Sequence, residues 1–250
     1  MGGGTTVAQQ STISRRQFVQ TTAASSLALA GIGLGRPAGA QSPKPNIVFI
    51  IADDLGYVDV SCYGQRDYAT PNIDRLAIEG LRFTQGYSNS PDCSATRVAL
   101  ITGRYQSRLT VGLEEPIAPR TPQDIGLPPS HPTLPSLLKK AGYRTALVGK
   151  WHLGSLPDFS PLKSGYDQFF GIFGCCADYF NHGVNALQAY QLPIPGLASQ
   201  LHEQEVPVER VGYMTNLLGD RAVQMIEGQV QGAVSAEPTF HGSALAMGRP

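Results

Sequence analysis

Apolar residues from residue 45 onward fall into short continuous runs and into longer stretches with helical spacing. Residues 46–52 (NIVFIIA) form a continuous apolar run, which predicts a buried parallel strand. A second short apolar strand is predicted over 143–149. Residues 214–227 (MTNLLGDRAVQMIE) have apolar positions at helical spacing, which predicts a helix. Strand and helix signals alternate, and this alternation predicts an α/β fold.

Start and stop signals place further elements. Thr70-Pro71-Asn72 is typical of a helix start, so we expect a helix within 68–77. Residues 96–103 predict a short helix that ends at Gly103, and residues 80–84 (GLRFT) predict a strand that leads toward it. From about residue 236 the chain is rich in Gly, Ala and Ser, and we expect no buried strand there.

The amino terminus has the pattern of an export signal. Residues 14–19 (SRRQFV) resemble a twin-arginine motif, and residues 21–35 are mildly apolar but too short for a permanent membrane anchor. Residues 38–40 (AGA) suit cleavage, so we interpret 1–40 as a signal peptide and 41–250 as the mature chain. This predicts a bacterial protein that the twin-arginine translocase delivers to the periplasm or the exterior.

Charge and cysteine content exclude some classes of function. The formal net charge is zero and the pI is about 7.0, without a basic block, so we expect no nucleic-acid partner. Adjacent cysteines form only a strained disulfide, so Cys175 and Cys176 are interpreted as buried free thiols. A disulfide that involves Cys62 is left open.

Candidate chemistry is concentrated in three short segments. Cys93 lies near the predicted start of a helix, where amide groups favour an anion, and Arg97 follows one turn later on the same face. Asp53-Asp54 follow the first predicted strand, where adjacent carboxylates repel each other unless a cation lies between them. Lys150 and His152 follow the second strand and would project to the same side, forming an anion site. Trp151 would then point toward the core.

These segments together resemble the sulfatase family. The extended signature comprises Cys93, Ala95, Arg97 and Thr102-Gly103-Arg104, and it is accompanied by the Asp53-Asp54 strand end, the 70–77 helix (TPNIDRLA) and the 149–154 segment (GKWHLG). The resemblance covers roughly residues 44–230. It implies an alkaline-phosphatase-like α/β fold with a mixed, mostly parallel central sheet flanked by helices.

The resemblance also implies a site and a reaction. A formylglycine-generating enzyme would oxidise Cys93, and the hydrated aldehyde would attack the sulfur of a sulfated small molecule or glycan. Arg97, Lys150 and His152 would stabilise the sulfate group. Asp53, Asp54 and residue 93 would bind Ca²⁺, or alternatively Mg²⁺. His182, in a segment that varies within the family, would either contact the substrate or be structural.

The family pattern is incomplete in this sequence. A second Asp-Asn calcium-ligand pair and a later His and Lys of the family have no counterpart here, so we expect the amino-terminal portion of a catalytic domain, with a divergent tail from about 236. Two alternatives to a sulfuric ester hydrolase remain. One is a phosphoester or phosphonate hydrolase of the same superfamily, and the other is an inactive, truncated sulfatase fragment.

Overall fold

The computed structural model of the chain describes residues 44–113, 117, 124–182, 200–229 and 243–248. Residues from Pro45 onward form one compact unit. The predicted signal peptide, residues 1–40, lies outside the described residues, so export remains a prediction. No helix in the described ranges is long and apolar enough to cross a membrane.

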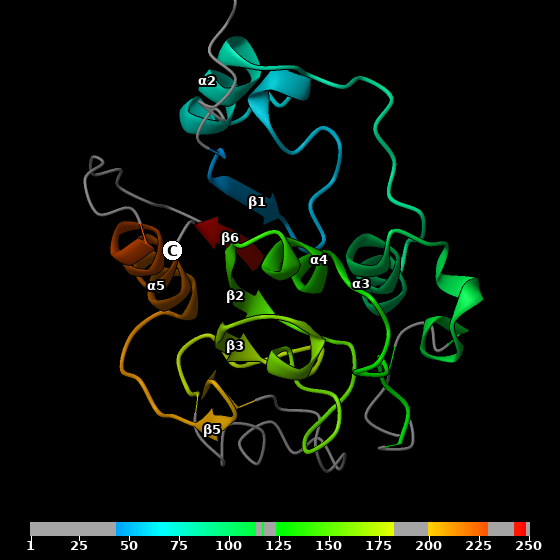
Figure 1. Cartoon of the computed structure of the whole chain (residues 1–250). Coiled ribbons are helices and arrows are strands. Elements are labelled where there is room, and N and C mark those ends of the chain that lie inside the picture. The colour runs from blue at the N-terminus through cyan, green and yellow to red at the C-terminus, as the bar shows by residue number, and fades with distance from the viewer. Residues whose placement is uncertain (1–43, 114–116, 118–123, 183–199, 230–242, 249–250) are drawn as a thin grey trace, which may run out of the picture. The chain divides into compact units, whose positions relative to one another are not determined.

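A six-stranded mixed sheet forms the centre of this unit (Figure 1). Its order is β1-β6-β2-β3-β4-β5, and only the β2–β3 pair is parallel. The prediction of a mostly parallel sheet is therefore wrong for this chain. The reason is topological, because β6 enters antiparallel between β1 and β2, and a short hairpin adds β4 and β5 antiparallel to β3. The strands are β1 (Ile47–Ile51), β2 (Arg144–Lys150), β3 (Gln168–Ile172), β4 (His202–Glu203), β5 (Val206–Pro207) and β6 (Ser243–Gly248).

The tail contributes a central strand, contrary to the sequence-based expectation. In β6, Ala246 pairs with Val48 of β1 on one side and with Ala146 of β2 on the other. Strand pairing uses the backbone N–H and C=O groups, which a segment of small residues such as SALAMG offers at every position. A strand held from both sides therefore does not require a long apolar run.

The first strand lies at an edge of the sheet instead of being buried. β1 has β6 as its only neighbour in the sheet, as far as the described residues go. Val48, Phe49 and Ile50 are 50%, 37% and 41% exposed. The strand itself was correctly predicted over 46–52, but its burial was not, because burial depends on which elements cover it.

In the segment between β1 and α3 (Cys93–Thr102), the predicted helix is present and the predicted strand is absent. The helix α2 (Pro71–Glu79) begins at Thr70-Pro71 as expected, although none of its residues is buried. Residues 80–84 do not form a strand, and Leu81 and Phe83 are 86% and 69% exposed. Edge-to-edge hydrogen bonding stabilises a strand, and no described strand lies beside this segment.

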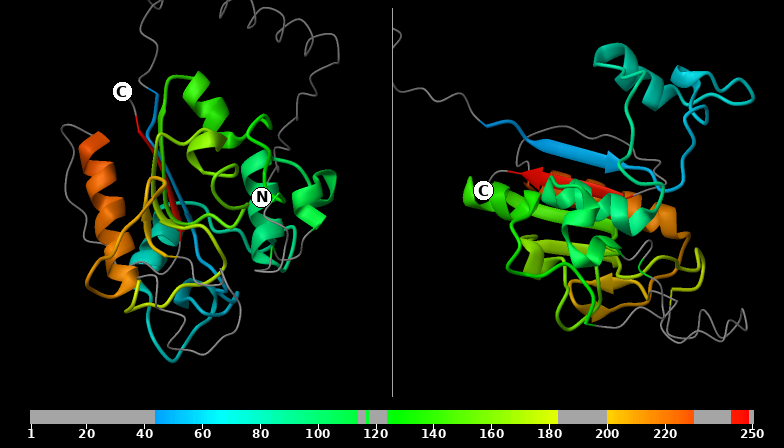
Figure 2. Two further views of the ribbon diagram at one scale, coloured as in Figure 1. Left: turned by 90° about the horizontal axis from the view of Figure 1, so that it is seen from below. Right: turned by 90° about the vertical axis from the view of Figure 1, so that its right-hand side faces the viewer.

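Helices cover both faces of the sheet (Figure 2). The helix α5 (Met214–Gln229) packs on one face, whereas α3 and α4 (Leu134–Lys140) lie on the other. Side chains along β2 point alternately to the two faces of the sheet, so the core has two parts. Leu147 joins Trp151 and Phe169 on the side of α3, while Val148 joins Phe170 and Met225 on the side of α5. Four 3-10 helices complete the described elements: Ser61–Tyr63, Gln106–Arg108, Thr110–Leu113 and Leu162–Ser164. The α/β class with flanking helices is thus confirmed.

Candidate active site

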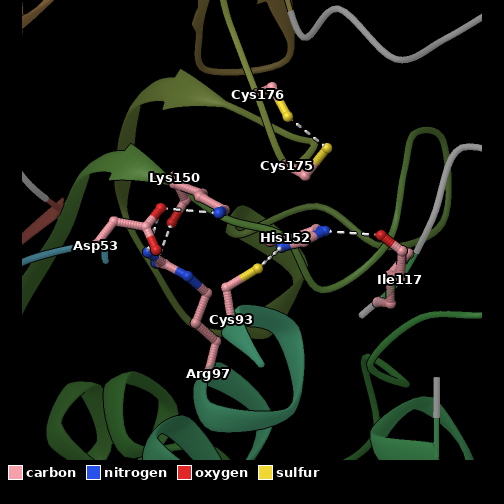
Figure 3. Close-up of polar contacts among 8 residues, drawn as sticks. All are labelled: Asp53, Cys93, Arg97, Ile117, Lys150, His152, Cys175 and Cys176. Atoms are coloured by element: carbon pink, nitrogen blue, oxygen red, sulfur yellow. Dashed lines mark hydrogen bonds and ion pairs between the residues drawn. The ribbon is translucent and has the colours of Figure 1, made fainter. Parts of the chain in front are cut away.

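The start of α3 and the ends of β1 and β2 meet at one place (Figure 3). The helix α3 begins at Cys93, three residues before the predicted start, and ends at Gly103 as predicted. Gly103 has φ 65°, a left-handed conformation that glycine adopts at little cost and that closes the helix. Cys93 is therefore in the first turn of the helix, with its side chain partly exposed.

Cys93 faces His152 across the site. The Sγ atom of Cys93 lies 3.2 Å from Nδ1 of His152, and Nε2 of His152 lies 2.8 Å from the carbonyl oxygen of Ile117 (Figure 3). Burial lowers the pKa of His152 to about 4, so the ring is neutral at pH 7 and has a proton on one nitrogen only. A carbonyl oxygen can only accept a hydrogen bond, which assigns the proton to Nε2. Nδ1 is then left as the acceptor that faces Cys93.

The Ile117 carbonyl is itself held by the helix. The backbone N–H of Ile117 donates to Oγ of Ser94 at 2.7 Å, and Ser94 is fully buried. The residue that follows Cys93 therefore anchors Ile117, whose carbonyl group orients His152. These contacts link the helix start, Ile117 and the imidazole.

Arg97 extends from α3 beneath the end of β2. It is buried, and its Nη1 donates to the Lys150 carbonyl oxygen at 2.7 Å, while Nη2 lies 3.8 Å from Oδ2 of Asp53. Burial lowers the pKa of Arg97, and the nearby Asp53 and Cys93 oppose that shift. Burial also raises the pKa of Tyr166, and the neighbouring Arg97 charge acts in the opposite direction.

Lys150 is paired with the first of the two carboxylates. Its Nζ donates to Oδ2 of Asp53 at 2.8 Å, with only 10% of the lysine side chain exposed. Asp54 has φ 56°, a left-handed conformation that Asp tolerates better than most residues. The two carboxylates, Lys150, Cys175 and Cys176 line a cavity of about 370 Å³. A larger cavity of about 900 Å³ borders Thr96 and Gly103 on α3 but includes none of the predicted site residues.

Lys150 and His152 do reach the same site, although the chain between them is not extended. His152 has φ 58°, so the strand conformation ends before it. Its backbone N–H still donates to the Phe173 carbonyl oxygen, which continues the pairing with the segment after β3. Trp151 points into the core as predicted, is 2% exposed and packs edge-on against Tyr166.

His182 does not face this site. It is 3% exposed, and its Nδ1 and Nε2 lie 2.9 Å and 3.0 Å from the carbonyl oxygens of Arg210 and Tyr179. Both ring nitrogens are thus occupied by the backbone of the surrounding loops. Of the two roles left open by the sequence, this arrangement favours the structural one.

The predicted metal ligands do not form a complete set. Among the described residues, no group of three or more His, Cys, Asp or Glu side chains could hold a metal ion. Asp53 instead balances its charge against Lys150 and Arg97. Ca²⁺ takes six to eight oxygen ligands, and two adjacent carboxylates supply too few of them. The described residues therefore do not fit a calcium site by themselves.

Several residues of this site could not be identified from the sequence. The Ile117 carbonyl is a backbone group, and nothing in the sequence marks it as a hydrogen-bond acceptor for His152. Ser94 lies between two signature residues, Cys93 and Ala95, but the sequence indicates no role for it. Cys175 and Cys176 were expected to be buried, yet Cys175 is half-buried, Cys176 is exposed, and both line the cavity beside Lys150.

Comparison with known proteins identifies the family. The Sulfatase family model matches residues 45–240, so the chain belongs to the sulfatase family. It is 48% identical over 151 residues to rat N-acetylgalactosamine-6-sulfatase, covering 59% of this chain and 28% of that protein. It is 44% identical over 144 residues to mouse steryl-sulfatase, covering 54% of this chain and 23% of that protein. The chain therefore spans about a quarter of the length of these curated relatives.

Solved structures resemble this chain in fold. The crystal structure of Ps i-CgsB superposes with a TM-score of 0.65 at 34% identity, covering 75% of this chain and 42% of that one. Ps i-CgsB has also been crystallised in complex with k-i-k-neocarrahexaose.

Proposed function

We propose that this chain carries the nucleophile of a sulfuric ester hydrolase, with Cys93 as the residue that is converted to formylglycine. One observation carries the proposal: Sγ of Cys93 lies 3.2 Å from Nδ1 of a neutral His152, within one helical turn of Arg97. A nucleophile next to a proton acceptor and a guanidinium suits attack on an anionic ester. Membership of the sulfatase family supports a sulfate ester as that substrate.

Position 93 fits the modified residue. The side chain is partly exposed at a helix start, beside an acceptor nitrogen and away from the packed core. Formylglycine would supply a hydroxyl group, from its hydrated aldehyde, for attack on sulfur. His152 Nδ1 is placed to accept a proton from position 93, and its Nε2–H bond to Ile117 holds the ring in that tautomer.

Two cations supply the electrostatic part of the proposal. Lys150 and Arg97 both lie near Oδ2 of Asp53, and Lys150 also lines the cavity. A fixed positive field in a partly buried site stabilises charge that develops on a transferring sulfate group. We derive no step through a metal ion, because the described residues offer too few oxygen ligands for one.

The substrate class we propose is a sulfated glycan. One relative, N-acetylgalactosamine-6-sulfatase, is named after a sugar substrate, and Ps i-CgsB was crystallised with an oligosaccharide. Steryl-sulfatase is a relative at similar identity, so the sulfate ester of a non-sugar alcohol is the competing substrate class.

The first test is peptide mass spectrometry of the protein from a host with a formylglycine-generating enzyme, followed by turnover assays. We expect the peptide that contains residue 93 to be about 18 Da lighter than the thiol form. We also expect turnover of an aryl sulfate to exceed that of an aryl phosphate, and Cys93→Ala to abolish it without unfolding the chain. Faster turnover of the phosphate would indicate a phosphoester hydrolase. Complete modification without turnover of either ester would mean an inactive fragment.

A further inference from the structure

A pair of cysteines lies on the opposite side of Lys150 from Cys93 (Figure 3). Cys175 and Cys176 follow β3 directly, and their sulfur atoms are 2.9 Å apart. This is shorter than van der Waals contact between two sulfurs, and a disulfide bond would need them to approach by less than about 1 Å more. Cys175 is half-buried and Cys176 is exposed, so solutes can reach the pair.

The surroundings of the pair favour thiolate chemistry. Both cysteines line the cavity of about 370 Å³ together with Lys150, Asp53 and Asp54. The hydrogen bond with Cys175 lowers the pKa of Cys176 to about 6; burial and the two carboxylates oppose this shift, and the Lys150 charge assists it. Partly exposed cysteines beside a cation are the ones that react with disulfides. The Cys175 thiol has its pKa raised by the same hydrogen bond.

We propose that Cys175 and Cys176 form a redox-active dithiol that small-molecule disulfides oxidise reversibly to a disulfide between neighbours. The Cys176 thiolate attacks one sulfur of the oxidant and displaces one thiolate, which takes up a proton. The Cys175 thiol then loses its proton, attacks the Cys176 sulfur of this mixed disulfide and displaces the second thiolate of the oxidant, which also takes up a proton. The protein loses two protons and two electrons, and the oxidant gains both. Because a disulfide between neighbours is strained, it is also readily reduced again.

This inference does not rest on the proposed function, because its readout is the state of the sulfurs. The full-length Cys62→Ser/Cys93→Ser variant keeps only the pair. It is incubated with mixtures of reduced and oxidised glutathione, quenched by alkylation at successive times up to equilibrium and analysed by peptide mass spectrometry. Two matched variants add Cys175→Ser or Cys176→Ser, so that each keeps a single thiol.

We expect the pair variant to lose two hydrogens in the peptide that contains both cysteines, without a lasting glutathione adduct. The variant that keeps Cys176 alone should accumulate the adduct, and the variant that keeps Cys175 alone should react more slowly. The intramolecular bond should form at least about tenfold faster in the folded chain than in urea, because the fold already holds the sulfurs together. A stable glutathione adduct on the pair variant, thiols that resist oxidation, or equal rates in urea would each overturn the inference.

Discussion

Nδ1 of His152 lies 3.2 Å from Sγ of Cys93, although 58 residues separate them in the sequence. The imidazole is oriented from its other side, where Nε2 meets the Ile117 carbonyl oxygen at 2.8 Å. One ring therefore connects the predicted nucleophile to Ile117, whose backbone N–H donates to Ser94, the neighbour of that nucleophile.

Two substitutions of His152 separate its two contacts. Asn can place a carbonyl oxygen where Nδ1 lies, and it tolerates the left-handed φ of 58° at this position. Gln can place an amide N–H where Nε2 lies. We expect His152→Gln to lower aryl sulfate turnover by about 100-fold or more, because the acceptor that faces residue 93 is lost. His152→Asn should retain more activity. The reverse order of kcat values in the two variants would contradict the assignment of Nδ1 as the acceptor.

Lys150 should contribute to turnover through its positive charge. Lys150→Met removes one of the two cations beside Asp53, and we expect about a 100-fold loss of turnover, with Lys150→Arg retaining more of it. The exposed Lys140 at the end of α4 provides a matched control, and Lys140→Met should leave turnover unchanged. Steady-state kinetics of the three variants checks this. An equal loss in Lys150→Met and Lys140→Met would show that only net charge matters.

Stability should fall as the pH is lowered through the range in which His152 titrates. Burial holds its pKa at about 4 in the folded chain, compared with 6.5 when it is exposed. Between these values the unfolded chain binds more protons, so the free energy of unfolding rises with pH. The stability that neutral His152 contributes is fully present above about pH 6.5. It is lost as the pH falls through about 4, which lowers the free energy of unfolding by about 3 kcal/mol.

Urea denaturation at several pH values measures this dependence. His202 contributes with the same sign, because burial also lowers its pKa, so the slope should shrink in His152→Asn but not disappear. If the free energy of unfolding of that variant had the same slope against pH, His152 would not be the cause of the pH dependence.

Calcium should bind this chain weakly. Two carboxylates, one of them paired with Lys150, predict a dissociation constant above about 1 mM. Isothermal titration of the purified full-length chain checks this, with Asp54→Asn as the control, because Asn tolerates the same backbone conformation. Tighter binding that Asp54→Asn abolishes would show that oxygen ligands beyond the two carboxylates complete the site.

The local elements and the chemical types of the site residues were predictable from the sequence alone. The helix that starts at Cys93 and ends at Gly103, the apolar strand before Asp53, and the core position of Trp151 all follow from periodicity and from end signals within a few residues. These features depend on interactions between residues that are close in the sequence, so they can be predicted from it.

The three-dimensional fold set the remaining features. It paired Ser243–Gly248 between β1 and β2, which made the sheet mostly antiparallel and left β1 at an edge. It turned His152 toward Cys93 and Lys150 toward Asp53, and it placed both ring nitrogens of His182 against backbone carbonyls. Strand partners, burial and backbone acceptors such as the Ile117 carbonyl arise from contacts between distant segments. Backbone groups are the same in every residue, so the sequence does not reveal which of them will meet.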